Sequence, residues 1–205
     1  MTQHAFIIDD DEAIRDSLNW LLQSRGVACQ TFCSAEAFLE AWDASLAGCI
    51  LLDVRMEGMS GTELYERLLE RGCRLPVIFL TGHGDVPMAV STLKNGAFDF
   101  VEKPFNDNEL VDRIIEALKL EESQRIAAAS ADSINSRISQ LTVRERQVME
   151  RVLAGKLNKV IADELQISKR TVEVHRSSLF EKMGVRTAVE LAQKLSAGSG
   201  NPEFD

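Results

Sequence analysis

Short apolar stretches rich in β-forming residues alternate with helical patterns throughout the first half of this 205-residue chain. Five stretches predict strands, at 5–8, 27–32, 49–52, 76–80 and 97–101. Four segments between them have apolar residues at three- and four-residue spacing, typical of amphipathic helices, at 14–22, 37–42, 64–69 and 86–93. Because a helix follows each strand, the pattern predicts an α/β domain with a doubly wound, five-stranded parallel sheet.

The second half of the chain has a different pattern. Beyond residue 138 it contains four short amphipathic helical patterns and no strand-like stretch. The Ala- and Ser-rich segment 119–139 looks like an extension of a fifth helix that leads into a linker. We therefore expect four parts, which are a first domain over 1–122, a helical linker over 123–137, an all-α domain over 138–197, and a tail over 198–205.

The balance of acidic and basic residues changes at the same place in the chain. The net charge is −9, yet residues 1–120 carry 10 basic and 20 acidic side chains, whereas residues 138–205 carry 11 and 9. An acidic first domain and a mildly basic second one indicate different partners, so the overall charge does not exclude nucleic acid. The four cysteines lack CxxC spacing, and neither a signal peptide nor an apolar stretch of about 18 residues is recognisable. We expect a soluble cytoplasmic protein with reduced thiols and no membrane partner.

Polar side chains follow four of the five predicted strands. Asp9 and Asp10 follow the first strand, Asp53 the third, Thr81 the fourth and Lys103 the fifth. Because the carboxyl ends of parallel strands meet at one edge of a sheet, we expect these side chains to lie together. Three carboxylates make a hard oxygen site suited to Mg²⁺, beside which Asp53 can act as a nucleophile on a phosphoryl group. Lys103 would then stabilise charge on the phosphoryl oxygens, and Thr81 would offer them a hydroxyl.

These segments also show a family resemblance. The stretches FIIDDDE, LLDVRMEGMSG, TGHGDVPMAV and VEKPF resemble the receiver domain of bacterial response regulators, specifically the FixJ-like branch, over roughly residues 4–122. The resemblance implies that Asp53 is the phosphoacceptor and that Asp9 and Asp10 form the acidic pocket. It also implies that the backbone carbonyl of Arg55 completes the magnesium shell.

The same resemblance implies a conformational switch. Thr81 and Phe100 match the switch hydroxyl and the switch aromatic, and Lys103 matches the phosphate-binding lysine. The peptide bond between Lys103 and the proline that follows is expected to be cis. The sequence departs from the branch at one position, because Glu57 stands where a proline usually follows the Arg-Met pair. We expect this loop to be looser and to place extra negative charge near the phosphate.

A helix-turn-helix pattern is present in the second domain. In GKLNKVIADELQISKRTVEVH, two amphipathic helices are joined by a short turn, and Ser168 is placed to cap the second. Upstream, Thr142 and Glu145 have the spacing of a capping box. Residues 138–196 resemble the LuxR/FixJ-type DNA-binding domain, which implies that the helix over 169–183 enters the major groove of double-stranded DNA.

The resemblance also indicates which side chains meet DNA. Lys159 and Arg176 match phosphate contacts. The residues placed to approach bases are Lys169, Arg170, Glu173, Val174 and Ser177. His175 is expected to pack between helices or to face phosphate, since it has no partner residues at zinc spacing.

Simpler structural interpretations exist for several of these residues. Asp53 alone fits a helix cap, Phe100 alone fits a core aromatic, and the basic helix alone fits a solvated surface. Asp11 and Glu12 are expected to be first-turn acids of the first helix, and His83 an exposed loop residue. The coincidence of polar groups at one sheet edge, together with the turn pattern in the second domain, favours the functional interpretation.

The sequence thus predicts a regulator rather than an enzyme. A sensor histidine kinase would phosphorylate Asp53, and a homodimer would then bind palindromic promoter sites, as an activator that works with RNA polymerase. Two other classes stay open. A metal-dependent aspartyl-phosphate hydrolase usually has a second acid two residues after the nucleophile, where this chain has Arg55. The second alternative class is a receiver whose helical domain binds RNA or protein.

Overall fold

The computed structural model describes residues 2–82 and 93–199, with only the backbone of 197–199. The chain divides into two compact units, Met1–Ser123 and Gln124–Asp205. Within the described residues, no helix has the length and apolar character needed to cross a membrane.

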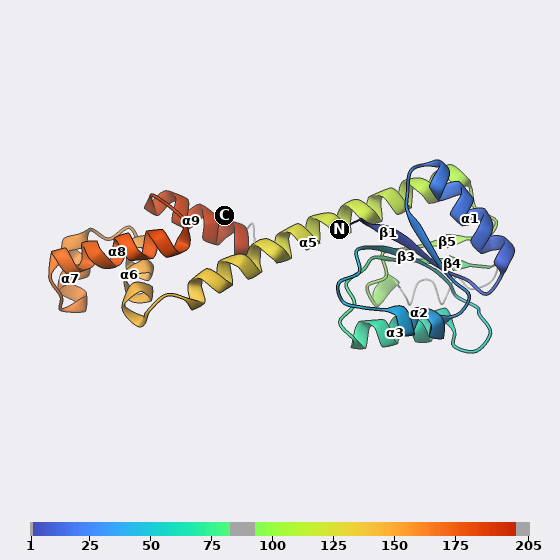
Figure 1. The fold of residues 1–205 in the computed structure, drawn as a ribbon, viewed down its shortest axis with the longest axis horizontal. Coiled ribbons are helices and arrows are strands. Elements are labelled where there is room, and N and C mark those ends of the chain that lie inside the picture. The colour runs from blue at the N-terminus through green and yellow to red at the C-terminus, as the bar shows by residue number, and fades with distance from the viewer. Residues whose placement is uncertain (1, 83–92, 200–205) are drawn as a thin grey trace. The chain divides into compact units, whose positions relative to one another are not determined.

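The first unit is built on a parallel sheet of five strands in the order β2-β1-β3-β4-β5 (Figure 1). The strands are β1 (His4–Ile8), β2 (Cys29–Phe32), β3 (Gly48–Asp53), β4 (Val77–Thr81) and β5 (Asp99–Glu102). All five predicted strands are present, and the predicted fold class is confirmed. Since β1 and β3 lie inside the sheet and are covered on both faces, their sequences are almost uniformly apolar.

Helices cover both faces of this sheet (Figure 1). They are α1 (Glu12–Ser24), α2 (Ala35–Ala41), α3 (Gly61–Glu70) and α5 (Asp107–Ser139). Successive side chains of a strand point to opposite faces, so Ala5 and Ile7 of β1 pack under α1 and α5, whereas Phe6 and Ile8 pack under α2 and α3. The helix expected over 86–93 falls almost entirely outside the described residues, as does His83.

The starts of the helices follow the expected capping chemistry. Glu12 lies in the first turn of α1, as predicted, whereas Asp11 precedes the helix and caps it by accepting a hydrogen bond from the Ala13 N–H group. Ser60 and Glu63 form a complete capping box at α3. These caps fix where each helix leaves the edge of the sheet that carries the polar side chains.

The long helix α5 continues into the second unit, which contains α6 (Val143–Leu153), α7 (Asn158–Leu165), α8 (Lys169–Met183) and α9 (Ala188–Ser199). The core of the second unit contains buried apolar side chains from each of these helices, among them Val148, Ile161, Val172 and Leu191. The last turns of α5 add Ile134. The predicted all-α architecture of the second domain is therefore confirmed.

Candidate phosphorylation site and DNA-binding helix

The parallel strands place four polar side chains at one edge of the sheet. Asp53 and Thr81 are the last residues of β3 and β4, and Asp9 and Lys103 directly follow β1 and β5. Strand pairing sets Asp53 beside Leu80, and Thr81 beside Glu102. Because all four strands run in the same direction, residues far apart in the chain meet at their carboxyl ends.

Lys103 joins two of these acids. Its Nζ atom lies 2.6 Å from Asp53 Oδ1 and 2.8 Å from Asp9 Oδ2. Asp9 and Asp53 are buried, with exposed fractions of 1% and 7%. One ammonium group therefore faces two buried carboxylates and can neutralise only one of them. The excess negative charge that is left suits a cation.

Burial and pairing both perturb the pKa values of this cluster. Burial raises the pKa of Asp53 above its usual value, and the hydrogen bond and charge of Lys103 only partly oppose this effect. Burial lowers the pKa of Lys103, but its hydrogen bonds to Asp53 and Asp9 outweigh burial and raise that pKa. The lysine is thus held in its charged form.

The loop after β3 approaches the cluster with its backbone. The N–H group of Arg55 donates to Asp53 Oδ2 at 2.8 Å, and the N–H group of Glu57 donates to Asp10 Oδ2 at 2.9 Å. The backbone of Glu57 thus ties the loop to Asp10, and the looser loop expected from the sequence stays a prediction. A Cβ atom on Gly61 would lie 2.0 Å from the carbonyl oxygen of Asp53, so only glycine allows α3 to start so close to that residue.

Asp10 does not join the other two acids in this arrangement. Among the described residues, no group of three or more His, Cys, Asp or Glu side chains is arranged to hold a metal ion. Chemically the set still fits Mg²⁺, because Asp9, Asp10 and Asp53 supply carboxylate oxygens only, the ligands that this cation prefers.

The two predicted switch residues lie on neighbouring strands. Thr81 is 3% exposed, and its hydroxyl donates to the Gly82 carbonyl at 3.3 Å. Phe100 is half-buried and packs against the core beneath α2 and α3, while its N–H group donates to Asp99 Oδ1 at 2.8 Å. The peptide bond between Lys103 and Pro104 is cis, as expected.

In the second unit, α7 and α8 form the predicted helix-turn-helix. Helix α7 ends at Leu165, and Gln166 follows in the left-handed conformation with φ 54°. Ser168 accepts a hydrogen bond from the Thr171 N–H group at 3.1 Å and so caps α8, as predicted. The caps fix the point at which α8 begins and therefore which side chains occupy its first turns.

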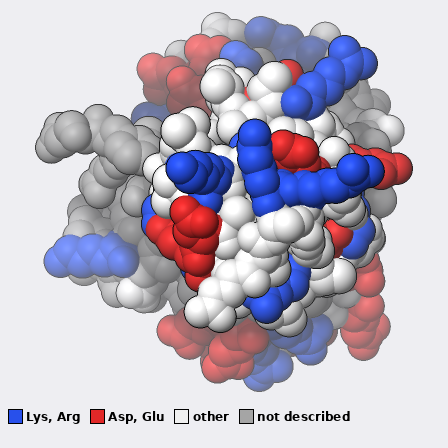
Figure 2. All heavy atoms as spheres, turned by 90° about the vertical axis from the view of Figure 1, so that its left-hand side faces the viewer, with Lys and Arg blue, Asp and Glu red and all other residues white. Residues whose placement is uncertain are grey.

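Most of the predicted DNA contacts are exposed. They are Lys159, Lys169, Arg170, Glu173, Val174 and Ser177. Arg176 differs, because it is half-buried, donates to Asn158 Oδ1 at 2.6 Å, and lies 5.4 Å from the centre of the Phe180 ring. Figure 2 shows Lys and Arg side chains spread over one face of the second unit, with Asp and Glu between them.

One buried acid of this unit has a role that sequence analysis did not find. Glu145, 4% exposed on α6, accepts hydrogen bonds from Ser178 Oγ at 2.6 Å and from Lys182 Nζ at 2.7 and 3.0 Å. It also completes the predicted capping box with Thr142. The capping motif predicted the hydrogen bond between Glu145 and the Thr142 backbone, but nothing in the local sequence indicated that Glu145 also bonds to side chains of α8.

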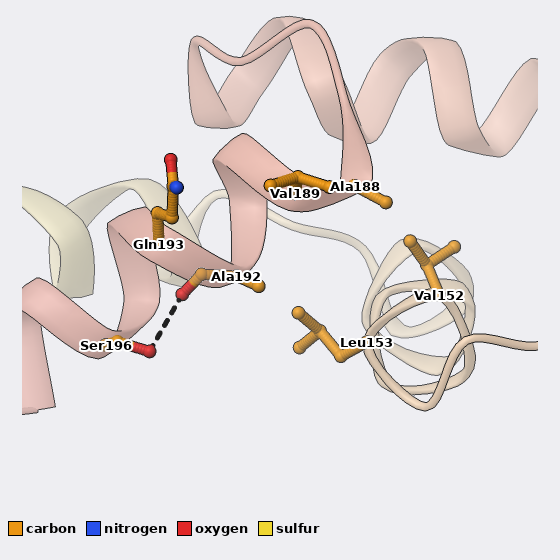
Figure 3. Close-up of a pocket in the computed structure, with 7 residues that line it drawn as sticks. All are labelled: Val152, Leu153, Ala188, Val189, Ala192, Gln193 and Ser196. Carbon is orange, nitrogen blue, oxygen red and sulfur yellow. Dashed lines mark hydrogen bonds between the residues drawn. The ribbon is translucent and has the colours of Figure 1, made fainter.

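A pocket of about 560 Å³ lies between α6 and α9 (Figure 3). Its lining combines apolar side chains with two polar ones and contains Val152, Leu153, Ala188, Val189, Ala192, Gln193 and Ser196. The Ser196 hydroxyl donates to the Ala192 carbonyl at 3.0 Å (Figure 3). Since no ionisable group lines the pocket, it lacks the acids and bases that general acid–base chemistry requires.

An acidic strand-end cluster around a lysine, followed by a helix-turn-helix, defines a phosphorylation-controlled DNA-binding protein. Residues 5–115 match the family described as response regulator receiver domain, and residues 139–195 match the family described as bacterial regulatory proteins, luxR family. The chain belongs to the two-component response regulators with a LuxR-type DNA-binding domain, and it is a transcriptional regulator.

Full-length relatives support this membership. The chain is 49% identical to the C4-dicarboxylate transport transcriptional regulatory protein DctR of Rhodobacter capsulatus, covering 91% of this chain and 96% of the relative. It is 45% identical to the transcriptional regulatory protein FixJ of Bradyrhizobium diazoefficiens, covering 93% of each.

Solved structures agree. The response regulator StyR matches with a TM-score of 0.89 at 40% identity, covering 96% of this chain and 99% of that one. Full-length FixJ from B. japonicum matches with a TM-score of 0.61 at 44% identity, covering 98% of this chain and 100% of that one. Receiver domains generally bind Mg²⁺ at their phosphorylation site.

Proposed function

We propose that a sensor histidine kinase phosphorylates Asp53 and that this modification controls DNA binding by α8. The observation that carries the proposal is the position of Lys103 Nζ, within hydrogen-bonding distance of both Asp53 and Asp9 at the ends of buried strands. Because Lys103 is held charged beside Asp53 and Asp9, it can stabilise the negative charge of a phosphoryl group that is bound to Asp53.

The reaction is a phosphoryl transfer. A carboxylate oxygen of Asp53 forms the new O–P bond while the P–N bond to the kinase histidine breaks and the imidazole nitrogen leaves with the electron pair. Lys103 stabilises charge on the phosphoryl oxygens, and the Thr81 hydroxyl donates a hydrogen bond to one of them. Mg²⁺, held by Asp9, Asp10, Asp53 and the backbone carbonyl of Arg55, would neutralise further charge in the same place.

Phosphorylation then changes the receiver surface. When the Thr81 side chain turns toward the phosphoryl group, it vacates space that the half-buried ring of Phe100 can enter, and this alters the face around β5. Two phosphorylated receivers pair through that face. In this proposal residues 1–122 form the receiver, 123–137 the helical linker and 138–197 the DNA-binding domain, and 198–205 is a tail.

Pairing brings two copies of α8 onto a palindromic site, so binding gains from effective concentration. Lys159 and Arg176 contact phosphates, while Lys169, Arg170, Glu173, Val174 and Ser177 approach bases. The protein acts in the cytoplasm as an activator that works with RNA polymerase. The relatives DctR and FixJ are named transcriptional regulatory proteins, which supports a role in transcription.

An aspartyl-phosphate hydrolase is the alternative with related chemistry, and Arg55 argues against it. Its position, two residues after Asp53, is where such an enzyme needs an acid that exchanges protons near neutral pH. A guanidinium group stays protonated and cannot serve as that acid or base. We therefore assign no enzymatic activity beyond the phosphorylation and dephosphorylation of Asp53 itself.

Labelling with acetyl phosphate and Mg²⁺ tests the proposal. Wild-type protein should acquire one acid-labile phosphoryl group, and Asp53→Asn should acquire none, because its amide is not a nucleophile. Full labelling of Asp53→Asn would remove the assignment. A footprint on genomic DNA fragments, with and without acetyl phosphate, then identifies the operator and distinguishes DNA binding from RNA or protein binding.

A further inference from the structure

The loop between β3 and α3 is held by its own backbone amides. Three alternate N–H groups of this loop each donate to a carboxylate on a different element. The bonds run from Arg55 to Asp53 at 2.8 Å, from Glu57 to Asp10 at 2.9 Å, and from Met59 to Glu36 at 3.0 Å. These acids belong to the end of β3, the turn after β1 and helix α2. The middle bond reaches an acid of the proposed magnesium site.

That middle bond depends on the residue type at position 57. Proline has no N–H group to donate, so a proline at this position would remove the bond. Glu57 supplies the donor and gives this chain a hydrogen bond that the same chain with proline at position 57 cannot form. Its backbone amide, rather than its carboxylate, makes the contact with Asp10.

The bond has a consequence for the acids around Lys103. Asp9 and Asp53 converge on the lysine at 2.8 and 2.6 Å, whereas Asp10 is engaged with Glu57. Within the described part of the chain, the acids are not gathered around one point. A cation that draws Asp10 toward Asp9 and Asp53 must therefore pull the Asp10 carboxylate away from the Glu57 amide.

We propose that the Glu57 N–H group is a positioning group that holds the Asp10 carboxylate on the loop between β3 and α3 and lowers the affinity of the site for Mg²⁺. The inference rests on the magnesium site of the proposed function and adds a residue that adjusts it. Phosphorylation of this chain then requires more free Mg²⁺ than phosphorylation of the same chain with proline at position 57.

Two substitutions separate the effect of the Glu57 N–H group from the effect of its side-chain charge. Glu57→Ala and Glu57→Pro both remove the carboxylate, but only Glu57→Pro removes the N–H group. Titration of Mg²⁺ into the full chain by isothermal calorimetry should show that Glu57→Pro binds about 2- to 10-fold more tightly than Glu57→Ala, the range expected for one net hydrogen bond. Equal affinities, or weaker binding by Glu57→Pro, would overturn the inference.

Replacing the backbone amide of Glu57 by an ester removes the N–H group and keeps the side chain without a proline ring. This variant should bind Mg²⁺ more tightly than wild type by a similar factor, while its metal-free form unfolds at lower urea concentration. The opposite signs are diagnostic, because a loop that was merely loosened would lose both stability and metal affinity. A loss of both would therefore reject the competition.

Asp10→Ala separates this inference from the proposed function. If Asp10→Ala binds Mg²⁺ as tightly as wild type, Asp10 is no ligand, and this inference fails together with the place of Asp10 in the magnesium site, while phosphorylation of Asp53 is still tested by labelling. If Asp10→Ala abolishes binding while the ester variant and wild type have equal affinity, the magnesium site stands and only the role of Glu57 is rejected.

Discussion

The buried acid Glu145 gives the sharpest stability prediction for the DNA-binding unit. Glu145→Gln keeps the size and shape of the side chain but replaces one acceptor oxygen by an NH2 group, which can only donate hydrogen bonds. Every group that the carboxylate meets is a donor, namely the Thr142 N–H group, Ser178 Oγ and Lys182 Nζ. Lys182 Nζ contacts both carboxylate oxygens and can only donate, so whichever way the amide is turned, its NH2 group faces this donor.

The magnitude follows from the contacts. Each hydrogen bond to a charged acceptor contributes about 1.5–3 kcal/mol, and the side chain loses at least one. Lys182 is 32% exposed and can recover hydrogen bonds with water, which reduces the cost of losing its ion pair. We therefore expect Glu145→Gln to lower the free energy of unfolding of the second unit by about 2–3 kcal/mol. For a unit of this size, the melting temperature should fall by about 10–20 °C.

Differential scanning calorimetry of the full chain measures this effect, with Glu150→Gln as the matched control. Glu150 lies on the same helix with a 71% exposed side chain, so its change should cost less than about 0.5 kcal/mol. Because Glu145 anchors the helix that carries the predicted DNA contacts, Glu145→Gln should also weaken operator binding at temperatures where the unit stays folded. A loss of stability no larger than that of the control would refute the reasoning.

The pH dependence provides an independent check. Burial alone would raise the pKa of Glu145, but the hydrogen bonds from Lys182, Ser178 and Thr142 outweigh burial and lower it to about 2. The unfolded chain titrates near 4.3, so this contribution to stability is complete above that pH and is lost as the pH falls toward 2. The stability difference between wild type and Glu145→Gln should shrink over this range. A constant difference would contradict the assignment.

Three further predictions concern phosphorylation and DNA. Asp10→Ala should slow phosphorylation by acetyl phosphate, and the Mg²⁺ concentration for half-maximal labelling should rise. Thr81→Ala should leave phosphorylation of Asp53 largely intact but keep the protein monomeric in analytical ultracentrifugation, whereas phosphorylated wild type dimerises at micromolar concentration. In salt-dependent binding assays, Arg176→Ala should weaken binding to all sequences and reduce the salt slope by about 1, whereas Arg170→Ala should cost roughly 1–3 kcal/mol at one operator position. Equal losses on operator and random DNA for Arg170→Ala would refute this division of roles.

Much of the fold could be predicted because its signals are local. The apolar strand β1 and the capping motifs at Thr142 and Ser168 involve residues within four positions of each other, and all are confirmed. The alternation of strands and helices then leaves few topologies, because parallel crossovers are right-handed. Asp53 and Lys103 were expected at one edge for the same reason, and the structure brings them together.

Residue types and their spacing along the chain are enough to predict the class of protein, its two-part organisation, and the polar residues at the strand ends. Tertiary structure decided which of these residues touch. Asp9 shares Lys103 with Asp53, Asp10 turns to the amide of Glu57, and Glu145 reaches α8 across 33 and 37 residues. The physical reason is that a hydrogen bond forms only within about 3 Å, so it depends on the final packing of separate elements.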